Sequence, residues 1–181
     1  MSRIIYITGA SGTGTSSLGE LIEKKFDVNL IESDEITMLP TDPPFQFPRP
    51  KVERLPLLKE RMQDDKVNVI VGSINDWGNE IIQKADMFIL LYADFDIRKE
   101  RIKKREQARF GQKLVENKMV KTNYERLIEW TSQYDVFDDY RSLRRHKDLY
   151  DSFGNTKYMF TNCEVDDVFI TLREDLEKIV Y

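Results

Sequence analysis

The residues whose types and spacing best support chemistry lie in positions 9–17, GASGTGTSS. This stretch follows a short apolar run at positions 4–7 and precedes a segment in which Leu18, Leu21 and Ile22 share one helical face. Glycines let backbone N–H groups curl around an anion, and a helix start adds free N–H groups and the positive end of its dipole. The strand, turn and helix together predict a phosphate-binding loop.

The spacing is that of a Walker A loop, G-x-x-x-x-G-K-[ST], with one substitution. Gly9, Gly14 and Ser16 fit the two glycine positions and the magnesium-ligand position, whereas Thr15 stands where the motif has lysine. That lysine makes a charge-assisted hydrogen bond to the outer phosphates, worth roughly 1.5–3 kcal/mol. We therefore expect ATP and Mg²⁺ here, with the cation supplied from elsewhere or absent. The predicted nucleotide-binding residues are Gly9, Ser11, Gly12, Thr13, Gly14, Thr15, Ser16 and Ser17, with Ser16 also on the metal.

Two other interpretations of this loop compete with phosphate binding. One is an ordinary turn between a strand and a helix. The other is the dinucleotide loop of a Rossmann dehydrogenase, but its third glycine would be needed at position 15, and the chain has glycine at Gly14. No Tyr-x-x-x-Lys pair of a short-chain dehydrogenase occurs in the sequence.

Composition limits the remaining classes. The 181 residues suffice for one domain with its own core, and 33% charged with 40% hydrophobic residues is typical of a globular protein. A net charge of −4 argues against a general nucleic-acid-binding protein. No apolar stretch is long enough for a membrane span, and Met1 leads directly into a predicted strand, so we expect neither a membrane partner nor a signal peptide. The single cysteine excludes a disulfide framework and favours the cytoplasm. With only one histidine as well, a Cys/His metal cluster is excluded. The sequence leaves the oligomeric state open.

Carboxylates and prolines follow the second predicted strand, residues 28–31. Asp34 is placed to ligate magnesium through water, to act as a base on an acceptor hydroxyl, or to hydrogen-bond a substrate; a solvated loop carboxylate is the alternative. All six prolines lie between positions 40 and 56. We interpret residues from about 36 to 66 as a substrate-side excursion, with a stiff connector as the alternative, and expect its helix to run from about Arg54 to Asp65 with Pro56 in the first turn.

The third strand, residues 67–73, is continuously apolar and ends in Gly72-Ser73, where a ligand can approach the backbone closely. Ser73 and Trp77 are therefore candidate substrate-binding residues, although an aromatic such as Trp77 also suits the core. Further strands are expected at residues 87–92 and 157–161, and an amphipathic helix closes the chain.

Positive charge is concentrated in a basic segment from about 98 to 121. Arg101, Arg105 and Arg109 are four residues apart and share one helical face, an arrangement suited to bidentate contact with phosphates. A solvated basic helix is the alternative. Arg141 and Arg145 form a second pair with the same spacing; Arg145 is assigned to catalysis with Arg105 and Arg109, and Arg141 to substrate binding. The nearby His146 has no partner evident in the sequence, so a structural role is expected.

Five apolar strands alternating with helices predict a five-stranded parallel sheet covered on both faces, in an α/β fold of three layers. With the loop after the first strand and the basic helix after the fourth, the chain resembles the nucleoside-monophosphate-kinase branch of P-loop proteins, which includes adenylate and shikimate kinases. The resemblance implies a single domain, residues 1–181, in which the loop holds the donor phosphates. It also implies that the basic segment from about 98 to 121 is a lid, whose arginines, among Arg101, Arg105 and Arg109, close over the phosphates.

Five pieces give a closer resemblance, to a poorly characterised bacterial group labelled adenylate-kinase-like or AAA-family ATPase. They are TGASGTGTS (8–16), LPTDPPF (39–45), VGS with WG (71–73 and 77–78), REQARFG (105–111) and RSLRRH (141–146). This group implies that threonine at the lysine position is a shared feature. Where an adenylate kinase has an Asp-Gly-Phe-Pro-Arg-like stretch, this chain has Gly-Ser-Ile-Asn-Asp (72–76), so AMP is not the expected acceptor. The sequence predicts an ATP-dependent phosphotransferase acting on a small molecule or nucleotide, or alternatively a catalytically weak nucleotide- or phosphate-binding module.

Overall fold

Five apolar segments form the strands of one parallel sheet in the computed structural model, which describes residues 3–42, 44–139 and 141–181. The strand order is β2-β3-β1-β4-β5. The strands are β1 (Ile4–Gly9), β2 (Val28–Glu32), β3 (Val67–Val71), β4 (Met87–Tyr92) and β5 (Thr156–Thr161). The parallel register places the end of β1 beside the ends of β3 and β4, with Ile7 opposite Val71 and Gly9 opposite Leu91. The predicted α/β fold with a five-stranded parallel sheet is confirmed.

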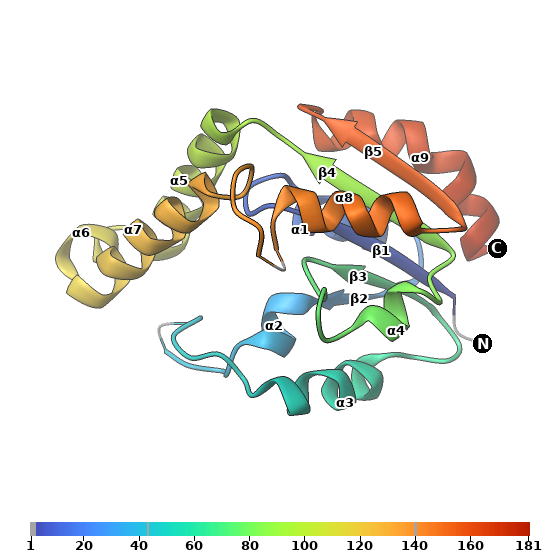
Figure 1. The fold of residues 1–181 in the computed structure, drawn as a ribbon, viewed down its shortest axis with the longest axis horizontal. Helices are drawn as coiled ribbons and strands as arrows, with labels where there is room; N and C mark the ends of the chain where they lie inside the picture. The colour runs from blue at the N-terminus through green and yellow to red at the C-terminus, as the bar shows by residue number, and fades with distance from the viewer. Residues whose placement is uncertain (1–2, 43, 140) are drawn as a thin grey trace.

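Helices cover both faces of this sheet (Figure 1). They are α1 (Thr15–Lys25), α2 (Ser33–Thr37), α3 (Lys51–Arg61), α4 (Asn79–Ile82), α5 (Phe95–Phe110), α6 (Lys113–Glu116), α7 (Lys118–Ser132), α8 (Leu143–Ser152) and α9 (Val165–Val180). On one face, Leu18 and Ile22 of α1 and Leu172 of α9 pack against the strands. On the other face the core is built by α2, α3, α4 and α8, with Leu58 of α3 and Trp77 among its buried members.

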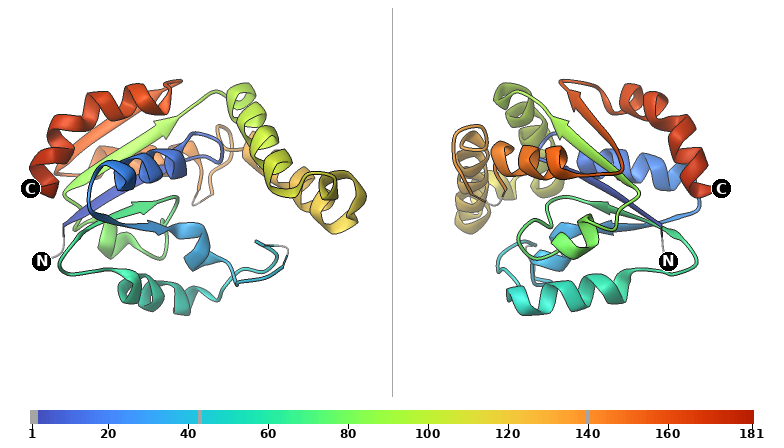
Figure 2. Two further views of the ribbon diagram at one scale, coloured as in Figure 1. Left: turned by 180° about the vertical axis from the view of Figure 1, so that it is seen from behind. Right: turned by 45° about the vertical axis from the view of Figure 1, so that its right-hand side comes forward.

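Three helices lie outside these layers. Figures 1 and 2 show α5, α6 and α7 projecting beyond the carboxyl ends of the strands as one helical arm. The predicted basic lid falls within this arm. None of the helices in the described part of the chain is long and apolar enough to cross a bilayer.

The helix after the proline-rich segment differs from the prediction. It begins at Lys51 and ends at Arg61, so Pro56 lies inside α3 and not in its first turn. Pro56 removes the N–H that would donate to the carbonyl of Val52, one turn earlier. Val52 is 83% exposed, so water can take the place of that donor. Exposure of this turn explains how α3 accommodates an internal proline.

Candidate functional site

The loop between β1 and α1 has the conformation that its glycines predict. Gly12 and Gly14 have φ angles of 86° and 102°, in the left-handed region that side chains disfavour. A Cβ on Gly12 would lie 2.6 Å from the carbonyl oxygen of Arg98, and one on Gly9 would lie 2.3 Å from that of Leu91. The loop is therefore seated against the end of β4 and the beginning of α5.

Three backbone N–H groups at the start of α1 make no hydrogen bond within the helix. The first helical hydrogen bond runs from Leu18 N to the carbonyl of Gly14, 2.9 Å away, so the N–H groups of Thr15, Ser16 and Ser17 precede the helical ladder. Thr13 has a different part, because its N–H and its hydroxyl both donate to the carbonyl of Ala10, at 3.2 and 2.8 Å. Its side chain shapes the turn.

The predicted magnesium ligand, Ser16, is hydrogen-bonded to the carboxylate of Glu32. The Ser16 hydroxyl donates to Glu32 Oε2 at 3.0 Å, and Glu32 is the last residue of β2. Burial raises the pKa of the Glu32 carboxyl; the Ser16 hydrogen bond opposes this rise, while the neighbouring Asp34 adds to it. Sequence analysis did not single out Glu32 among the carboxylates that follow the second predicted strand. Its position at the end of a strand was the signal that could have identified it.

Hydroxyl and carboxylate oxygens are the ligands that Mg²⁺ takes in phosphate-binding proteins, where substrate phosphates and water complete the coordination. The described residues contain no group of three His, Cys, Asp or Glu side chains that could hold a metal by themselves. Ser16 and Glu32 therefore fit a magnesium ion that shares its coordination with a nucleotide. They do not fit a metal held by protein side chains alone.

The three predicted lid arginines pair with two carboxylates of the chain itself. Arg105 and Arg109 both pair with Glu106, at 2.8 and 3.4 Å, and the Glu106 side chain is buried. The Arg109 guanidinium also lies 5.1 Å from the centre of the Phe45 ring. Arg101 pairs with Glu164 at 2.9 Å and approaches the carbonyl of Thr13 at 3.5 Å.

Arg98 belongs to the core and not to the solvated face of the predicted lid. It is 0% exposed and donates to the carbonyls of Ala93 and Thr131, each at 2.7 Å. It also forms an ion pair with Asp135 at 2.6 Å. Arg98 thus joins the start of α5 to the end of α7 and fixes the base of the arm.

The second arginine pair also separates into two environments. Arg145 pairs with Asp138 at 2.9 Å and is half exposed. Arg141 lines a small cavity together with Ala10 of the loop, and its guanidinium lies 5.7 Å from the Trp130 ring centre. Of these two residues, Arg141 is the one beside the phosphate-binding loop.

The predicted acceptor-side residues fall in different surroundings. Asp34 is exposed in the first turn of α2, two residues beyond Glu32. Ser73 is buried just past the end of β3, and its hydroxyl lies 3.3 Å from His146 Nε2. Trp77 is 9% exposed and is part of the core, and its indole Nε1 is without a hydrogen-bond partner among the described residues.

His146 is the centre of a buried polar network that sequence reasoning did not foresee. Its Nδ1 lies 2.8 Å from the Tyr134 hydroxyl, and its Nε2 lies 3.5 Å from the hydroxyl of Thr8 as well as near Ser73. Burial lowers the pKa of His146 to about 4, with a further contribution from the charge of Arg141. The imidazole is therefore neutral at pH 7.

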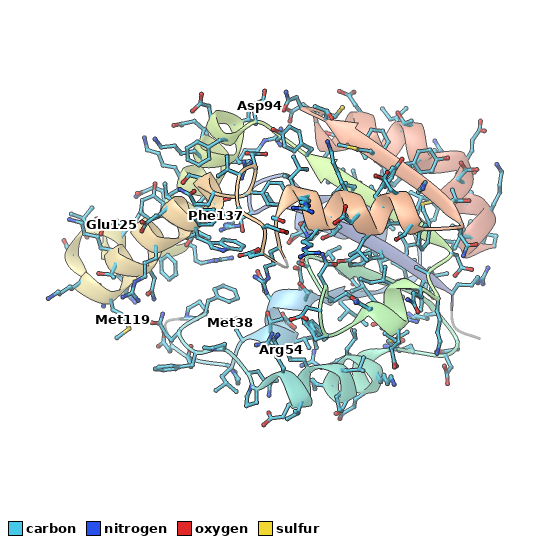
Figure 3. The ribbon with its side chains drawn as sticks, viewed as in Figure 1. Met38, Arg54, Asp94, Met119, Glu125 and Phe137 are labelled. Atoms are coloured by element: carbon cyan, nitrogen blue, oxygen red, sulfur yellow. The ribbon has the colours of Figure 1, made fainter. Side chains whose placement is uncertain are left out.

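The proline-rich segment reaches the arm. Gln46 Oε1 accepts a hydrogen bond of 2.8 Å from Asn123 of α7, and Phe45 lies under Arg109 of α5. Figure 3 labels Met119 on α7 in the arm and Met38 at the end of α2. A separate pocket of about 440 Å³ lies between α8 and the beginning of α4, and Asp76, Arg145 and Asp148 are in its lining.

Comparison with known proteins places the chain in a family. It is 30% identical over 135 residues to the uncharacterized protein YqaC of Bacillus subtilis (strain 168), an alignment covering 75% of this chain and 74% of YqaC. It is 25% identical over 113 residues to a cytidylate kinase of Archaeoglobus fulgidus, covering 56% of this chain and 61% of that enzyme. No family model matches the sequence.

Solved structures share the whole architecture at low identity. A gluconokinase from Sinorhizobium meliloti 1021 has a TM-score of 0.55 at 16% identity, covering 99% of this chain and 93% of its own. A tRNA delta(2)-isopentenylpyrophosphate transferase from Staphylococcus epidermidis has a TM-score of 0.56 at 12% identity, covering 98% and 100%. The fold is that of the P-loop kinases. The chain belongs to the same family as YqaC.

Proposed function

We propose that this protein is an ATP-dependent phosphotransferase whose acceptor is a small molecule or nucleotide. The observation that carries the proposal is the Ser16–Glu32 pair, 3.0 Å apart, at the start of a helix that follows a glycine loop. A hydroxyl and a carboxylate beside free helical N–H groups can serve a magnesium-bound polyphosphate. The cytidylate kinase and gluconokinase neighbours support the kinase assignment.

The residues have the following proposed roles. N–H groups at the start of α1 hold the β-phosphate, and Ser16 and Glu32 hold Mg²⁺, which when bound neutralises charge on the phosphates. The acceptor hydroxyl oxygen attacks the γ-phosphorus, the bond to the β–γ bridging oxygen breaks, ADP leaves, and the hydroxyl proton passes to Asp34. Ser73 and Trp77 lie on the acceptor side.

Thr15 cannot supply the positive charge that a lysine would bring to the phosphates. We assign this role mainly to Arg141, because its side chain lines a cavity together with Ala10 of the loop. Arg105 and Arg109 contribute further positive charge when the arm closes, because they then exchange their ion pairs with Glu106 for contacts with the phosphates. Arg145 faces the pocket beside α8 and is proposed to act there.

The first experiment is a calorimetric titration of the protein with ATP, with and without Mg²⁺, in phosphate-free buffer. We expect saturable binding that Mg²⁺ tightens. Arg141→Ala should weaken binding by about tenfold or more, the loss of one charged hydrogen bond. Lys147→Ala, an exposed cation on α8 that the proposal leaves without a role, is the matched control. No binding at millimolar nucleotide would overturn the proposal.

A second candidate function is a nucleotide-binding module without useful catalysis. The observation that favours it is that Arg105, Arg109 and Arg145 all pair with carboxylates of the chain itself. ADP release in the presence of candidate acceptors separates the two functions. If turnover occurs only in Thr15→Lys, the wild-type chain is a binding module; if wild type turns over and Arg141→Ala does not, it is an enzyme.

A further inference from the structure

A network of buried polar side chains lies at the carboxyl edge of the sheet, next to the loop. It consists of Thr8, Ser73, Tyr134 and His146. His146 is 0% exposed, Tyr134 is 6% exposed, and both face the carboxyl edge of the sheet. Thr8 directly precedes Gly9 of the loop, and Ser73 directly follows Gly72 at the end of β3. Burying polar groups costs free energy unless each is hydrogen-bonded, and here both imidazole nitrogens lie near hydroxyls. The network thus links α8 to the strand that leads into the phosphate-binding loop.

Tyr134 fixes the connector between α7 and α8 through both ends of the residue. Its hydroxyl contacts His146 Nδ1 at 2.8 Å, and its carbonyl accepts a hydrogen bond of 2.9 Å from Leu143 N. Ser142 caps α8 by accepting from Arg145 N at 3.3 Å. The connector carries Arg141 between these fixed points.

The place of Arg141 depends on this arrangement. Its backbone N–H donates to Asp139 Oδ1 at 2.7 Å, and its guanidinium lies over Trp130, the residue before Thr131 on α7. Arg141 lines the same small cavity as Ala10, the residue that follows the last residue of β1. A neutral His146 lets the guanidinium remain there without repulsion from a second cation.

We propose that Tyr134 and His146 are positioning residues that hold Arg141 beside the phosphate-binding loop. They do not contact the phosphates; they act through the connector that carries Arg141. The identity of the phosphate ligand in this inference rests on the proposed function, whereas the placement of Arg141 does not.

Tyr134→Phe is the variant of choice because it removes only the hydroxyl and retains the ring next to Arg98. Tyr150→Phe is the matched control: it makes the same change on α8, where the ring packs on Phe88 outside the network. Thermal melting of both variants establishes that they fold. We expect Tyr134→Phe to weaken Mg²⁺-ATP binding about three- to tenfold, the range expected for one lost hydrogen bond, and Tyr150→Phe to leave it unchanged.

A double-mutant cycle with Arg141→Ala separates positioning from a general structural effect. If Tyr134 acts through Arg141, Tyr134→Phe should change ATP affinity by less than about twofold in the Arg141→Ala background. Additive losses, or equal effects of Tyr134→Phe and Tyr150→Phe, would overturn the inference.

A second measurement needs no nucleotide. Trp130 is 38% exposed and lies under Arg141, whereas Trp77 is 9% exposed, so acrylamide quenching reports mainly on Trp130. Arg141→Ala should increase the quenching constant, Tyr134→Phe should increase it in the same direction, and Tyr150→Phe should not. If wild type fails to bind ATP while this pattern holds, the proposed function falls and the placement of Arg141 stands. If Tyr134→Phe leaves the quenching constant at the wild-type value, the placement itself is overturned.

Discussion

At the scale of single residues, Glu32 is the carboxylate that lies next to the predicted Mg²⁺ ligand, Ser16. It accepts a hydrogen bond from Ser16 at 3.0 Å, and burial raises its pKa. A divalent cation would favour the charged form of this carboxyl, because it sets an opposite charge beside a partly desolvated anion. Glu32 is therefore expected to matter for Mg²⁺ more than for the nucleotide itself.

We predict that Glu32→Gln lowers the affinity for Mg²⁺ in the presence of ATP by roughly tenfold, the lower end of the loss seen when a group supporting a metal is removed. ATP affinity without Mg²⁺ should be unchanged or higher, because a negative charge near the phosphates is gone. Calorimetric titrations with and without Mg²⁺ measure both quantities. Glu35→Gln is the control, since Glu35 lies in the same acidic stretch but pairs with Arg61 at 3.6 Å. Equal effects of the two variants would remove Glu32 from the metal site.

His146 supplies a prediction on pH. Its pKa is lowered from 6.5 to about 4 in the folded protein, mainly by burial. Between pH 6.5 and about 4 the unfolded chain therefore binds a proton that the folded chain does not. The free energy of unfolding falls as the pH is lowered through this window, by at most about 3 kcal/mol for this group, and its contribution is complete above pH 6.5.

The comparison that isolates this effect is wild type against His146→Gln, whose amide does not titrate. We expect the advantage of wild type over the variant in urea denaturation at pH 7 to shrink between pH 6.5 and pH 4. Acidic groups common to both proteins cancel in this difference. A difference that stays constant over the same range would mean that His146 is not held neutral in the folded state.

At the scale of helices, the base of the arm is determined by Arg98. Its guanidinium is fully buried and donates to Ala93, Thr131 and Asp135, so a fixed set of hydrogen bonds joins the start of α5 to the end of α7. The turn at Gly12 packs against the backbone of Arg98. The position of the arm and the conformation of the loop therefore depend on the same residue.

We predict that Arg98→Met destabilises the protein by about 3 kcal/mol, the range observed when one partner of a buried ion pair is removed. Arg101→Met, three residues along α5, should cost less than about 1 kcal/mol, because its partner Glu164 is largely exposed. Urea denaturation of both variants measures the difference. Similar losses for the two would show that Arg98 contributes no more than a surface charge.

At the scale of the whole molecule, the sequence predicted what depends on local pattern. The apolar runs located all five strands, and the glycine spacing located the loop, because both are properties of neighbouring residues. The partners of charged side chains depend on the tertiary fold. The row of Arg101, Arg105 and Arg109 was visible, but the pairing with Glu106 and Glu164 was not. The Tyr134–His146 contact needs the packing of α8 over the sheet, which no local pattern encodes.

The parts of the candidate site come together only in the folded chain. The loop follows β1, Glu32 ends β2, and Arg141 precedes α8. A ligand that needs all three binds the folded state and not the unfolded one, so it must stabilise the protein. At a concentration of 100 times its dissociation constant, Mg²⁺-ATP should add about 2.7 kcal/mol, or roughly 5–10 °C in Tm for a chain of this size.

Thermal melting with increasing ATP, in Mg²⁺ or in excess EDTA, checks this expectation. The increase in Tm should be larger with Mg²⁺ and should be reduced in Glu32→Gln to about the size seen in EDTA, because that variant lacks the carboxylate beside Ser16.

Gly12→Ala tests whether the loop itself binds the nucleotide. The added Cβ would lie 2.6 Å from the carbonyl oxygen of Arg98, in a backbone conformation with φ of 86°. It should lower the Tm without ligand and abolish the response to ATP, since it distorts the turn that both the arm and the phosphates use. A full ATP response in Gly12→Ala would place the nucleotide away from this loop.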